Sequence, residues 1–309
     1  MTMKAYLRKR YGGPEVFELT HVALPSPRPN KIRVRIAYSS INSAAVLLRK
    51  GVHPDSAFFT LIIRLVFGFP NPRRKIIGYE FSGVVDEVGA EVKKYKKGDA
   101  VYGTCTGLKQ GAYAEFVCVP EQWRLGIVRH KPAALSFAEA AALPIGGMTA
   151  ASLFSRLNAK AGESILVYGA SGSVGSYAVQ LAQAAGLQVT AVCSAASFPM
   201  MMDLGIDNCL DYRSAEFLQL TKKYDYVFDA VKKLPTKQLK AVLKPGGKLV
   251  SVGAPTSESH QWLEQLEALY AASKLRIYIE KIFSFDELRA AHAHADTGHK
   301  KGNLVMKHD

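Results

Sequence analysis

The chain has 309 residues, of which 48% are hydrophobic and 21% charged, so it is long enough for two domains and unlike disordered or collagen-like proteins. Its net charge of +14 would suit a phosphorylated ligand, a nucleic acid or an anionic membrane, but no aromatic residues interleave its dispersed lysines, so no nucleic-acid partner is expected. No apolar run is long enough to span a bilayer, no signal peptide is recognisable, and no two of the four cysteines form a Cys-x-x-Cys pair. We therefore expect a cytoplasmic protein without a membrane span.

The first third of the sequence predicts short strands separated by glycine turns. Apolar and basic residues alternate over 31–38, and short apolar runs cover 78–88, 100–102 and 111–119. Closely spaced short strands of this kind are typical of a barrel-like β domain.

The middle of the chain alternates between helical and strand-like segments. Helices are predicted at 136–143 and 172–185, and buried strands at 164–168, 187–193, 226–230 and 248–253. This alternation indicates βαβ units and a parallel sheet, hence an α/β domain. The tail predicts a strand at 275–282, a helix at 285–295 and a last strand at 302–306, which would return the chain to the β domain.

A glycine-rich turn after the strand 164–168 predicts a dinucleotide site. The turn and the start of the next helix read Gly169, Ala170, Ser171, Gly172, Ser173, Val174 and Gly175. Gly172 lets the backbone approach a pyrophosphate, Gly175 lets the helix pack close to the sheet, and the helix N-terminus offers N–H groups to the phosphates. Ala170 stands where the commonest fingerprint has its first glycine. The alternative is that these glycines serve packing alone.

The residue after the second strand of the βαβ unit bears on the choice between NADH and NADPH. An Asp or Glu there would bind the ribose hydroxyl and repel a 2′-phosphate, whereas this sequence has the small, uncharged Ser194. We therefore predict NADPH, with NADH possible. Tyr212 and Arg213 follow the next turn and would either help to hold the phosphate from the side or simply end a surface strand.

Several motifs resemble those of the medium-chain dehydrogenase/reductase superfamily. They are Gly78-Tyr79-Glu80-Phe81-Ser82-Gly83, Gly98-Asp99-Ala100-Val101-Tyr102-Gly103, Leu143-Pro144 with Gly147-Met148-Thr149-Ala150, and Leu243-Lys244-Pro245-Gly246-Gly247. The resemblance covers nearly the whole chain and is nearest to the zinc-free quinone oxidoreductase-like branch. It implies a GroES-like catalytic domain, here residues 1–126 and 274–309, and a doubly wound Rossmann domain, here residues 127–273. It also implies an active site between the domains.

The same resemblance implies NAD(P)H as the hydride donor and suggests residues that contact it. Asn42 matches an asparagine near the nicotinamide ribose and the substrate, and Thr149 matches a threonine near the nicotinamide. Val252, Gly253 and Ala254 match the backbone stretch beside the nicotinamide amide.

The zinc positions of related alcohol dehydrogenases are not filled by zinc ligands in this sequence. The first falls near Ser39 or Ser40, and the histidine position is Tyr79, so no zinc is expected. Without zinc, acceptors that spread negative charge themselves are favoured, namely quinones and α,β-unsaturated carbonyls. Tyr79 is a candidate proton donor, or it simply fills space. The alternatives are a zinc-type alcohol dehydrogenase, and a cofactor-binding protein with a structural or RNA-binding role.

Other positions depart from the branch. Asn42-Ser43-Ala44-Ala45 lacks the aspartate of an Asn-Pro-x-Asp stretch, and Lys232 stands where glycine is usual. The segment after Pro255 is too short for the strand that often joins two Rossmann sheets, so a homodimer is possible but in doubt. Residues 58–70 predict an amphipathic helix, which we expect to line a pocket or the core rather than to contact a partner or a membrane.

Overall fold

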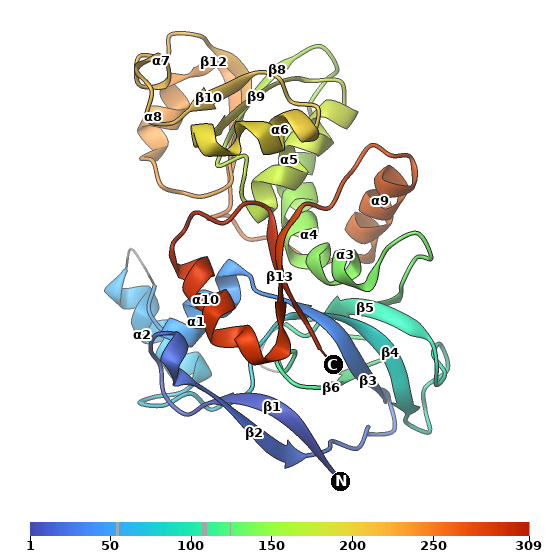
Figure 1. Ribbon diagram of the computed structural model, residues 1–309. Helices are drawn as coiled ribbons and strands as arrows, with labels where there is room; N and C mark the ends of the chain where they lie inside the picture. The colour runs from blue at the N-terminus through green and yellow to red at the C-terminus, as the bar shows by residue number, and fades with distance from the viewer. Residues whose placement is uncertain (54–55, 107–109, 124, 309) are drawn as a thin grey trace. The chain divides into compact units, whose positions relative to one another are not determined.

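The computed structural model describes residues 1–53, 56–106, 110–123 and 125–308. The chain divides into two compact units, Met1–Pro144 with Ile279–Asp309, and Ile145–Tyr278 (Figure 1). The two units therefore meet after Pro144 and after Tyr278, and not at the predicted boundaries 126/127 and 273/274, for two reasons. Helix α3 (Phe137–Ala142) packs on strands of the first unit. Residue Arg276 is held to the second unit by two hydrogen bonds between its backbone and the side chain of Gln180.

The first unit is a β domain with a seven-stranded sheet and a separate antiparallel pair. The sheet order is β13 (Ile279–Ser284), β14 (Asn303–Lys307), β3 (Lys31–Ser40), β4 (Glu80–Val88), β5 (Ala100–Thr104) and β7 (Val128–His130), with β6 (Phe116–Pro120) also paired to β3. The separate pair is β1 (Thr2–Arg8) with β2 (Phe17–Ala23). The runs predicted at 111–119 and 275–282 become strands only from Phe116 and from Ile279.

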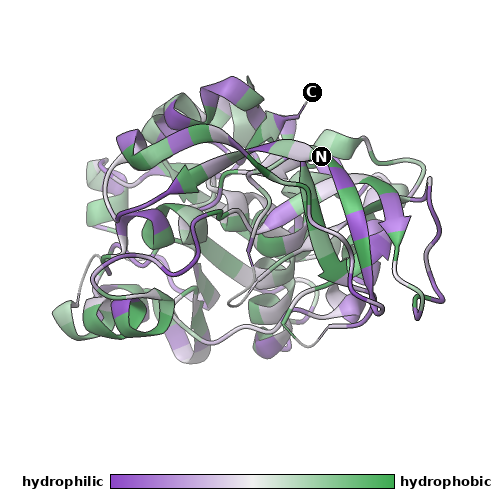
Figure 2. Cartoon of the chain, turned by 90° about the horizontal axis from the view of Figure 1, so that it is seen from below, coloured by the Kyte–Doolittle hydropathy of each residue, from purple (hydrophilic) through white to green (hydrophobic). Residues whose placement is uncertain are grey.

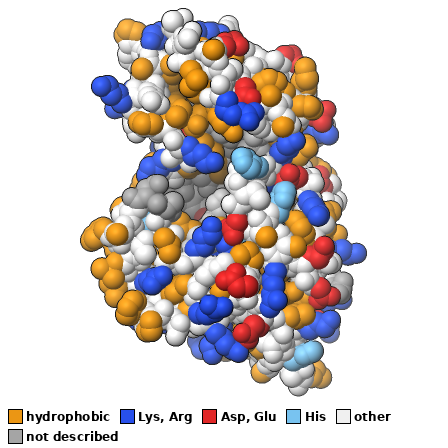
Figure 3. Space-filling model, turned by 60° about the vertical axis from the view of Figure 1, so that its left-hand side comes forward, with side chains coloured by type: hydrophobic (Ala, Val, Ile, Leu, Met, Phe, Trp, Pro, Cys, Tyr) orange, Lys and Arg blue, Asp and Glu red, His pale blue; other side chains and the backbone are white. Residues whose placement is uncertain are grey.

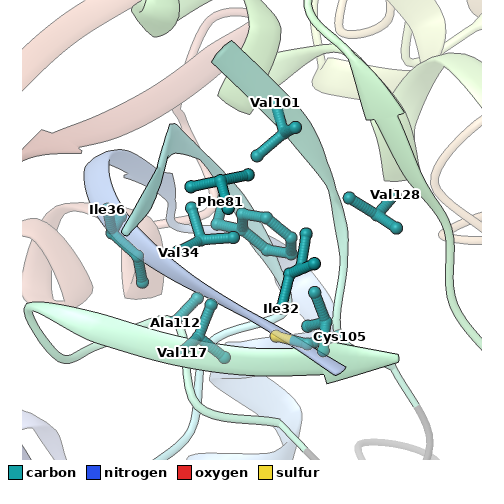
Figure 4. Close-up of a cluster of buried hydrophobic side chains, with 11 residues drawn as sticks. Ile32, Val34, Ile36, Phe81, Val101, Cys105, Ala112, Val117 and Val128 are labelled. Atoms are coloured by element: carbon teal, nitrogen blue, oxygen red, sulfur yellow. The ribbon is translucent and has the colours of Figure 1, made fainter. Parts of the chain in front are cut away.

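The core of this unit follows from the alternation in β3. Ile32, Val34 and Ile36 are buried, while the basic residues between them lie at least partly in solvent. The three side chains meet Phe81 of β4 and Val101 of β5 in one apolar cluster (Figure 4). Burial of such side chains is the main favourable term in folding, and here it fixes which face of β3 is turned inward.

Helices of the first unit flank these strands. They are α1 (Ser43–Lys50), α2 (Ala57–Phe67), α3 and α10 (Leu288–Asp296), with short 3₁₀ turns at Pro14–Val16 and Phe285–Glu287. Helix α3 begins at a capping box in which the side chains of Ser136 and Glu139 each accept the other's backbone N–H. Helix α2 forms where it is predicted, but none of its residues is buried, which corrects the expectation of a core-packed helix.

The second unit is built on a five-stranded parallel sheet. Its order is β10 (Cys209–Asp211), β9 (Gln188–Cys193), β8 (Ser164–Tyr168), β11 (Tyr224–Asp229) and β12 (Leu243–Ser251). Its helices are α4 (Pro144–Phe154), α5 (Ser173–Ala184), α6 (Phe198–Asp203), α7 (Ala215–Leu218), α8 (Thr236–Ala241) and α9 (His260–Ala271), with 3₁₀ turns at Ser155–Leu157 and Ala195–Ser197. The chain passes from β8 outward to β9 and β10 and then returns to the other side of β8. Ligands of such sheets bind beyond the carboxyl ends of the strands at this switch point.

Candidate functional site

The glycine-rich turn joins β8 to α5 as predicted. All five residues of β8 are buried, and the N–H groups of Gly169 and Ala170 donate to the Val192 carbonyl oxygen at 2.9 and 3.1 Å, which ties the turn to β9. Gly172 is the N-cap of α5 and supplies no side-chain acceptor to the N–H groups of the first turn. Ser171, Ser173 and Val174 are partly exposed. A helix start of this kind is suited to bind phosphate.

Two glycines of this turn are required for different reasons. A Cβ atom built on Gly172 would meet only the Gly169 carbonyl oxygen, at 3.5 Å, so the backbone at Gly172 borders open space. A Cβ atom on Gly175 would clash with the same oxygen and lie 2.8 Å from Ala170 Cα. Gly175 therefore serves the close packing of helix and turn, and the backbone at Gly172 leaves open space beside it. The turn fits a dinucleotide pyrophosphate.

Helix α4 lies against the start of α5 and positions Thr149. A Cβ atom on Gly146 would clash with the Ser173 hydroxyl oxygen and lie 3.1 Å from the ring of Tyr177. Gly146 therefore lets the two helices touch at the glycine-rich turn. Thr149 is three residues further along α4, hence on the same face of that helix, and is partly exposed. The sequence reasoning did not identify Gly146, whose signal is the Gly-Gly pair inside a helix.

A buried aspartate, which the sequence reasoning also missed, shapes the loops after β11 and β12. Asp229 is 3% exposed, and its Oδ1 accepts the N–H groups of Val231 and Lys232 at 3.1 and 2.8 Å. Its Oδ2 accepts the Ser251 hydroxyl at 2.9 Å. The only sequence signal is an acidic residue that ends an apolar strand.

The loop that Asp229 holds lies against the glycine-rich turn. A Cβ atom on Gly169 would meet a methyl group of Val231 at 2.5 Å, so Val231 packs on the turn. The side chain of Lys232 lies across Gly253, with its Nζ 3.1 Å from the position of a Cβ on that glycine. Val252 and Ala254 flank this glycine, and their N–H groups donate to the carbonyl oxygens of Asp229 and Ser251 at 3.0 and 2.9 Å.

Lys232 adopts an unusual backbone conformation. Its φ is 53°, in the left-handed region that favours glycine, which explains why glycine is usual at this position. The chain accepts the strain and thereby places a cationic side chain beside Gly253.

The carboxyl ends of β9 and β10 surround Ser194. Its hydroxyl lies 3.1 Å from the Ser197 hydroxyl, and the adjacent Ala195 N–H donates to Asp211 Oδ2 at 3.0 Å. Asp211 is paired with Arg213 at 2.8 Å, and this pairing holds the pKa of its carboxyl well below the usual range. Tyr212 lies under the Arg213 guanidinium, 5.4 Å from its ring centroid. An acidic group therefore does stand near Ser194, but its charge is balanced by an arginine.

In the first unit, Asn42 lies at the end of β3 and begins helix α1. Its Oδ1 accepts the Ala45 N–H at 2.9 Å as the helix cap, and its Nδ2 donates to Glu80 Oε2 at 2.9 Å. The Ser40 hydroxyl donates to the same oxygen. Glu80, which is 2% exposed, therefore fixes Asn42 and Ser40 together, a role that the sequence reasoning did not assign.

A lysine of the C-terminal segment lies close to Glu80. Lys300 Nζ donates to the Gly302 carbonyl oxygen at 2.8 Å. Burial lowers the pKa of Lys300 to about 8, although the negative charges of Glu80 and Glu280 oppose that shift. The carboxylate of Glu80 thus has a cationic neighbour as well as two hydrogen-bond donors.

Tyr79 is 8% exposed, and its hydroxyl oxygen accepts a hydrogen bond from Gln110 Nε2 at 3.3 Å. Burial raises the pKa of Tyr79 far above its usual value, while the nearby positive charge of Arg8 opposes the shift. The phenol is therefore neutral at physiological pH and retains a proton. That state allows it to donate and does not allow it to act as a base.

The residues at the zinc positions of alcohol dehydrogenases do not fit a zinc ion. Ser39 Oγ lies 2.9 Å from His308 Nε2, Ser40 is bonded to Glu80, and Tyr79 is bonded to Gln110. Hydroxyl groups are poor substitutes for the Cys, His and carboxylate ligands of zinc. Within the part of the chain that the structure describes, no group of three or more His, Cys, Asp or Glu side chains could hold a metal ion.

Comparisons with known proteins identify the family and the fold class. The family model described as "Alcohol dehydrogenase GroES-like domain" matches residues 28–130, and that of "Zinc-binding dehydrogenase" matches residues 173–287. A 2-methylene-furan-3-one reductase of Solanum lycopersicum is 32% identical, over 98% of this chain and 79% of the relative. The chloroplastic NADPH-dependent alkenal/one oxidoreductase of Arabidopsis thaliana is 30% identical over the same shares of the two chains. The structure of the quinone oxidoreductase from Coxiella burnetii has a TM-score of 0.83 and 26% identity, and 99% of each chain is covered.

A parallel sheet with a glycine-rich turn at the start of a helix, joined to a GroES-like β unit, defines the class of nucleotide-dependent dehydrogenases and reductases. The chain belongs to the medium-chain dehydrogenase/reductase superfamily, in its zinc-independent, quinone oxidoreductase-like branch. The family and the fold class predicted from the sequence motifs are thereby confirmed.

Proposed function

We propose that the protein is an NADPH-dependent reductase that transfers hydride to a quinone or an α,β-unsaturated carbonyl compound. The observation that carries this proposal is the glycine-rich turn, whose backbone at Gly172 borders open space at the uncapped start of α5. The names of two relatives, an alkenal/one oxidoreductase and a quinone oxidoreductase, support the substrate class. These acceptors spread negative charge over conjugated atoms and so require no metal to stabilise it.

The second unit would hold the cofactor at the carboxyl ends of its strands. The N–H groups of Ser173 and Val174 in the first turn of α5 would face the pyrophosphate, and Thr149 and the backbone of Val252–Ala254 would contact the nicotinamide. When bound, the reduced nicotinamide supplies the hydride. NADPH is favoured over NADH because Ser194 is uncharged, and because Arg213 balances the charge of Asp211, which is bonded to the next residue, Ala195; Arg213 would help to hold a 2′-phosphate from the side. Tyr212 would border the adenosine.

Two side chains of the first unit would act on the substrate. The Asn42 amide has one N–H left after its bond to Glu80, and this group would donate to the substrate oxygen. As hydride adds to the substrate, negative charge appears on that oxygen or on the conjugated carbon. The Tyr79 hydroxyl would supply the proton that neutralises it; because burial raises the pKa of Tyr79, the phenol would release this proton only to a strongly basic atom such as this one.

Other expectations stay predictions. The sheet order places β12 at an edge in the described part of the chain, so the strand that would join two Rossmann sheets is not formed there, and a homodimer stays in doubt. No helix in the described residues is long and apolar enough to cross a membrane. Residence in the cytoplasm stays a prediction, since the name of one relative places that relative in chloroplasts. No specific observation favours the zinc or RNA-binding alternatives.

The test is a titration of the purified protein with NADPH and with NADH, followed by reduced-nicotinamide fluorescence. A simple quinone or enone is then added and loss of reduced cofactor is measured. We expect tighter binding of NADPH and turnover with the conjugated acceptors. Binding of neither cofactor would overturn the proposal.

The role of Tyr79 is tested by Tyr79→Phe, with Tyr95→Phe as the matched control. Tyr95 also lies in the first unit and donates its hydroxyl to the Val128 carbonyl oxygen at 2.8 Å. We expect Tyr79→Phe to lower kcat by about tenfold or more with little change in the Kd for NADPH, because general acids contribute at least that much. An unchanged kcat would mean that Tyr79 only fills space.

A further inference from the structure

Helix α2 carries an apolar face that this chain does not cover. Seven large apolar side chains on α2 and just after it are between 38% and 67% exposed, namely Phe58, Phe59, Leu61, Ile62, Leu65, Val66 and Phe69. We call this set the α2 face. The helix is mostly green at the left-hand edge of Figure 2, and Figure 3 shows hydrophobic side chains gathered over it at the lower left. Exposed apolar patches of this kind mark sites of protein or membrane interaction.

The helix is anchored through its opposite, polar side. Thr60 Oγ1 accepts the His53 N–H at 2.8 Å, and Arg64 Nε donates to the Gly51 carbonyl oxygen at 3.1 Å. The Arg64 guanidinium also lies 5.3 Å from the ring centroid of Tyr11. Thr60 and Arg64 are four residues apart and therefore share one side of the helix. The anchoring thus fixes the orientation of α2 and turns the α2 face outward.

The sequence that follows the α2 face carries basic residues and no acidic ones. No Asp or Glu occurs between Asp55 and Glu80, whereas Arg73, Arg74 and Lys75 follow one another and are exposed. The Arg73 N–H donates to the carbonyl oxygen of Phe67, the last residue of α2, at 2.8 Å, so the basic run begins against the end of the helix. The three basic residues also line a shallow surface pocket of about 540 Å³.

We propose that the α2 face and the basic run Arg73–Lys75 form a docking surface for a bilayer that contains anionic phospholipid. Helix α2 would lie in the plane of the interface, with its apolar side chains among the upper acyl chains and the basic run among the headgroup phosphates. The helix is too short to span the bilayer and is suited to lie on it.

The charge pattern favours this occupant over a second copy of the chain. A symmetric dimer would bring the same patch of each copy together and would place two basic runs near each other. Their like charges repel, and the chain has a net charge of +14 with no acidic partner in this segment to offset them. An anionic lipid surface supplies the opposite charge and the apolar environment together. This proposal does not rest on the proposed reaction.

The test is co-sedimentation of the full-length protein with vesicles. One set is phosphatidylcholine alone and the other is equal parts phosphatidylcholine and phosphatidylserine. We expect binding to the mixed vesicles, weakened by added salt, and little binding to phosphatidylcholine alone. Phe58→Ser with Leu65→Ser should weaken binding by about tenfold or more, since both apolar side chains would enter the interface. Arg73→Gln with Arg74→Gln should remove the preference for phosphatidylserine.

Matched controls separate the possible occupants. Leu218 is 72% exposed on the second unit, and Leu218→Ser should leave vesicle binding unchanged. Because all the substituted side chains are exposed, each variant should keep the wild-type thermal unfolding curve. Equal binding by the wild type and the α2 variants, or no binding by either, would overturn the proposal. A wild-type dimer that Phe58→Ser with Leu65→Ser converts to a monomer would overturn it in favour of a second copy.

Discussion

Alanine substitutions at Gly172 and Gly175 should separate cofactor binding from folding. A methyl group on Gly172 would lie in ordinary contact with one backbone oxygen, at 3.5 Å, and the φ of −77° suits alanine. Gly172→Ala should therefore keep or slightly raise the free energy of unfolding, by less than about 1 kcal/mol. The same methyl group would occupy the space through which a pyrophosphate approaches the backbone. Loss of one hydrogen bond to a charged phosphate costs about 1.5–3 kcal/mol, so the Kd for NADPH should rise about tenfold to a hundredfold.

Gly175→Ala should behave differently because its methyl group has no room. It would clash with the Gly169 carbonyl oxygen and lie 2.8 Å from Ala170 Cα, and backbone atoms cannot move aside as a flexible side chain can. Overpacking of this kind costs about 1–3 kcal/mol of unfolding free energy. Urea unfolding measures that loss, and nicotinamide fluorescence titration measures Kd. A folded Gly172→Ala variant with wild-type affinity for NADPH would refute the assignment of the turn to the pyrophosphate.

Three further substitutions follow from the structure. Lys232→Gly should raise the free energy of unfolding by up to about 1 kcal/mol, because it relieves a left-handed φ of 53°. The control Lys233→Gly should lower the free energy of unfolding, and thermal unfolding of both variants measures the two changes. Asp229→Ala should cost about 2 kcal/mol or more and weaken NADPH binding, since two N–H groups and a hydroxyl lose their acceptor; stability unchanged in urea unfolding would contradict this. Burial lowers the pKa of His308 to about 3 from 6.5, so only the unfolded state takes up this proton as the pH falls below 6.5. Between pH 7 and pH 5, His308 should therefore lower the free energy of unfolding by about 2 kcal/mol. His308→Gln should remove this part of the pH-dependent loss, which urea unfolding of the wild type and the variant at the two pH values measures.

Local patterns were sufficient where one strong rule decides the structure. The alternation in β3 and the apolar run of β8 predict strands whose bounds the structure closely reproduces, because burial fixes which face turns inward. The glycine-rich turn could also be predicted, because glycines placed between a strand and a helix have few alternative uses. The run 111–119 misled because its apolar residues pack as a loop up to Phe116, and apolar content alone does not distinguish a strand from a buried loop.

Contacts between distant segments were beyond the sequence reasoning. Asn42 was assigned to the cofactor and the substrate, but its side chain also caps α1 and bonds to Glu80, 38 residues away. The exposure of α2 depends on anchors at Gly51 and Tyr11, which no periodicity within residues 58–70 reveals. Lys232 was recognised as unusual, yet its left-handed conformation depends on Asp229, which binds the backbone of the loop.

Glu80 and Asp229 have the same role in their two units. Each is a buried carboxylate at the end of a strand, and the two residues are 2% and 3% exposed. Glu80 accepts a hydrogen bond from the side chain of Asn42, and Asp229 accepts one from the backbone of Lys232. We therefore assign both as positioning residues, which hold Asn42 and the Lys232 loop in place. Tyr79, whose hydroxyl oxygen accepts a hydrogen bond from Gln110, stays the proposed proton donor of the first unit, and Tyr79→Phe tests that role.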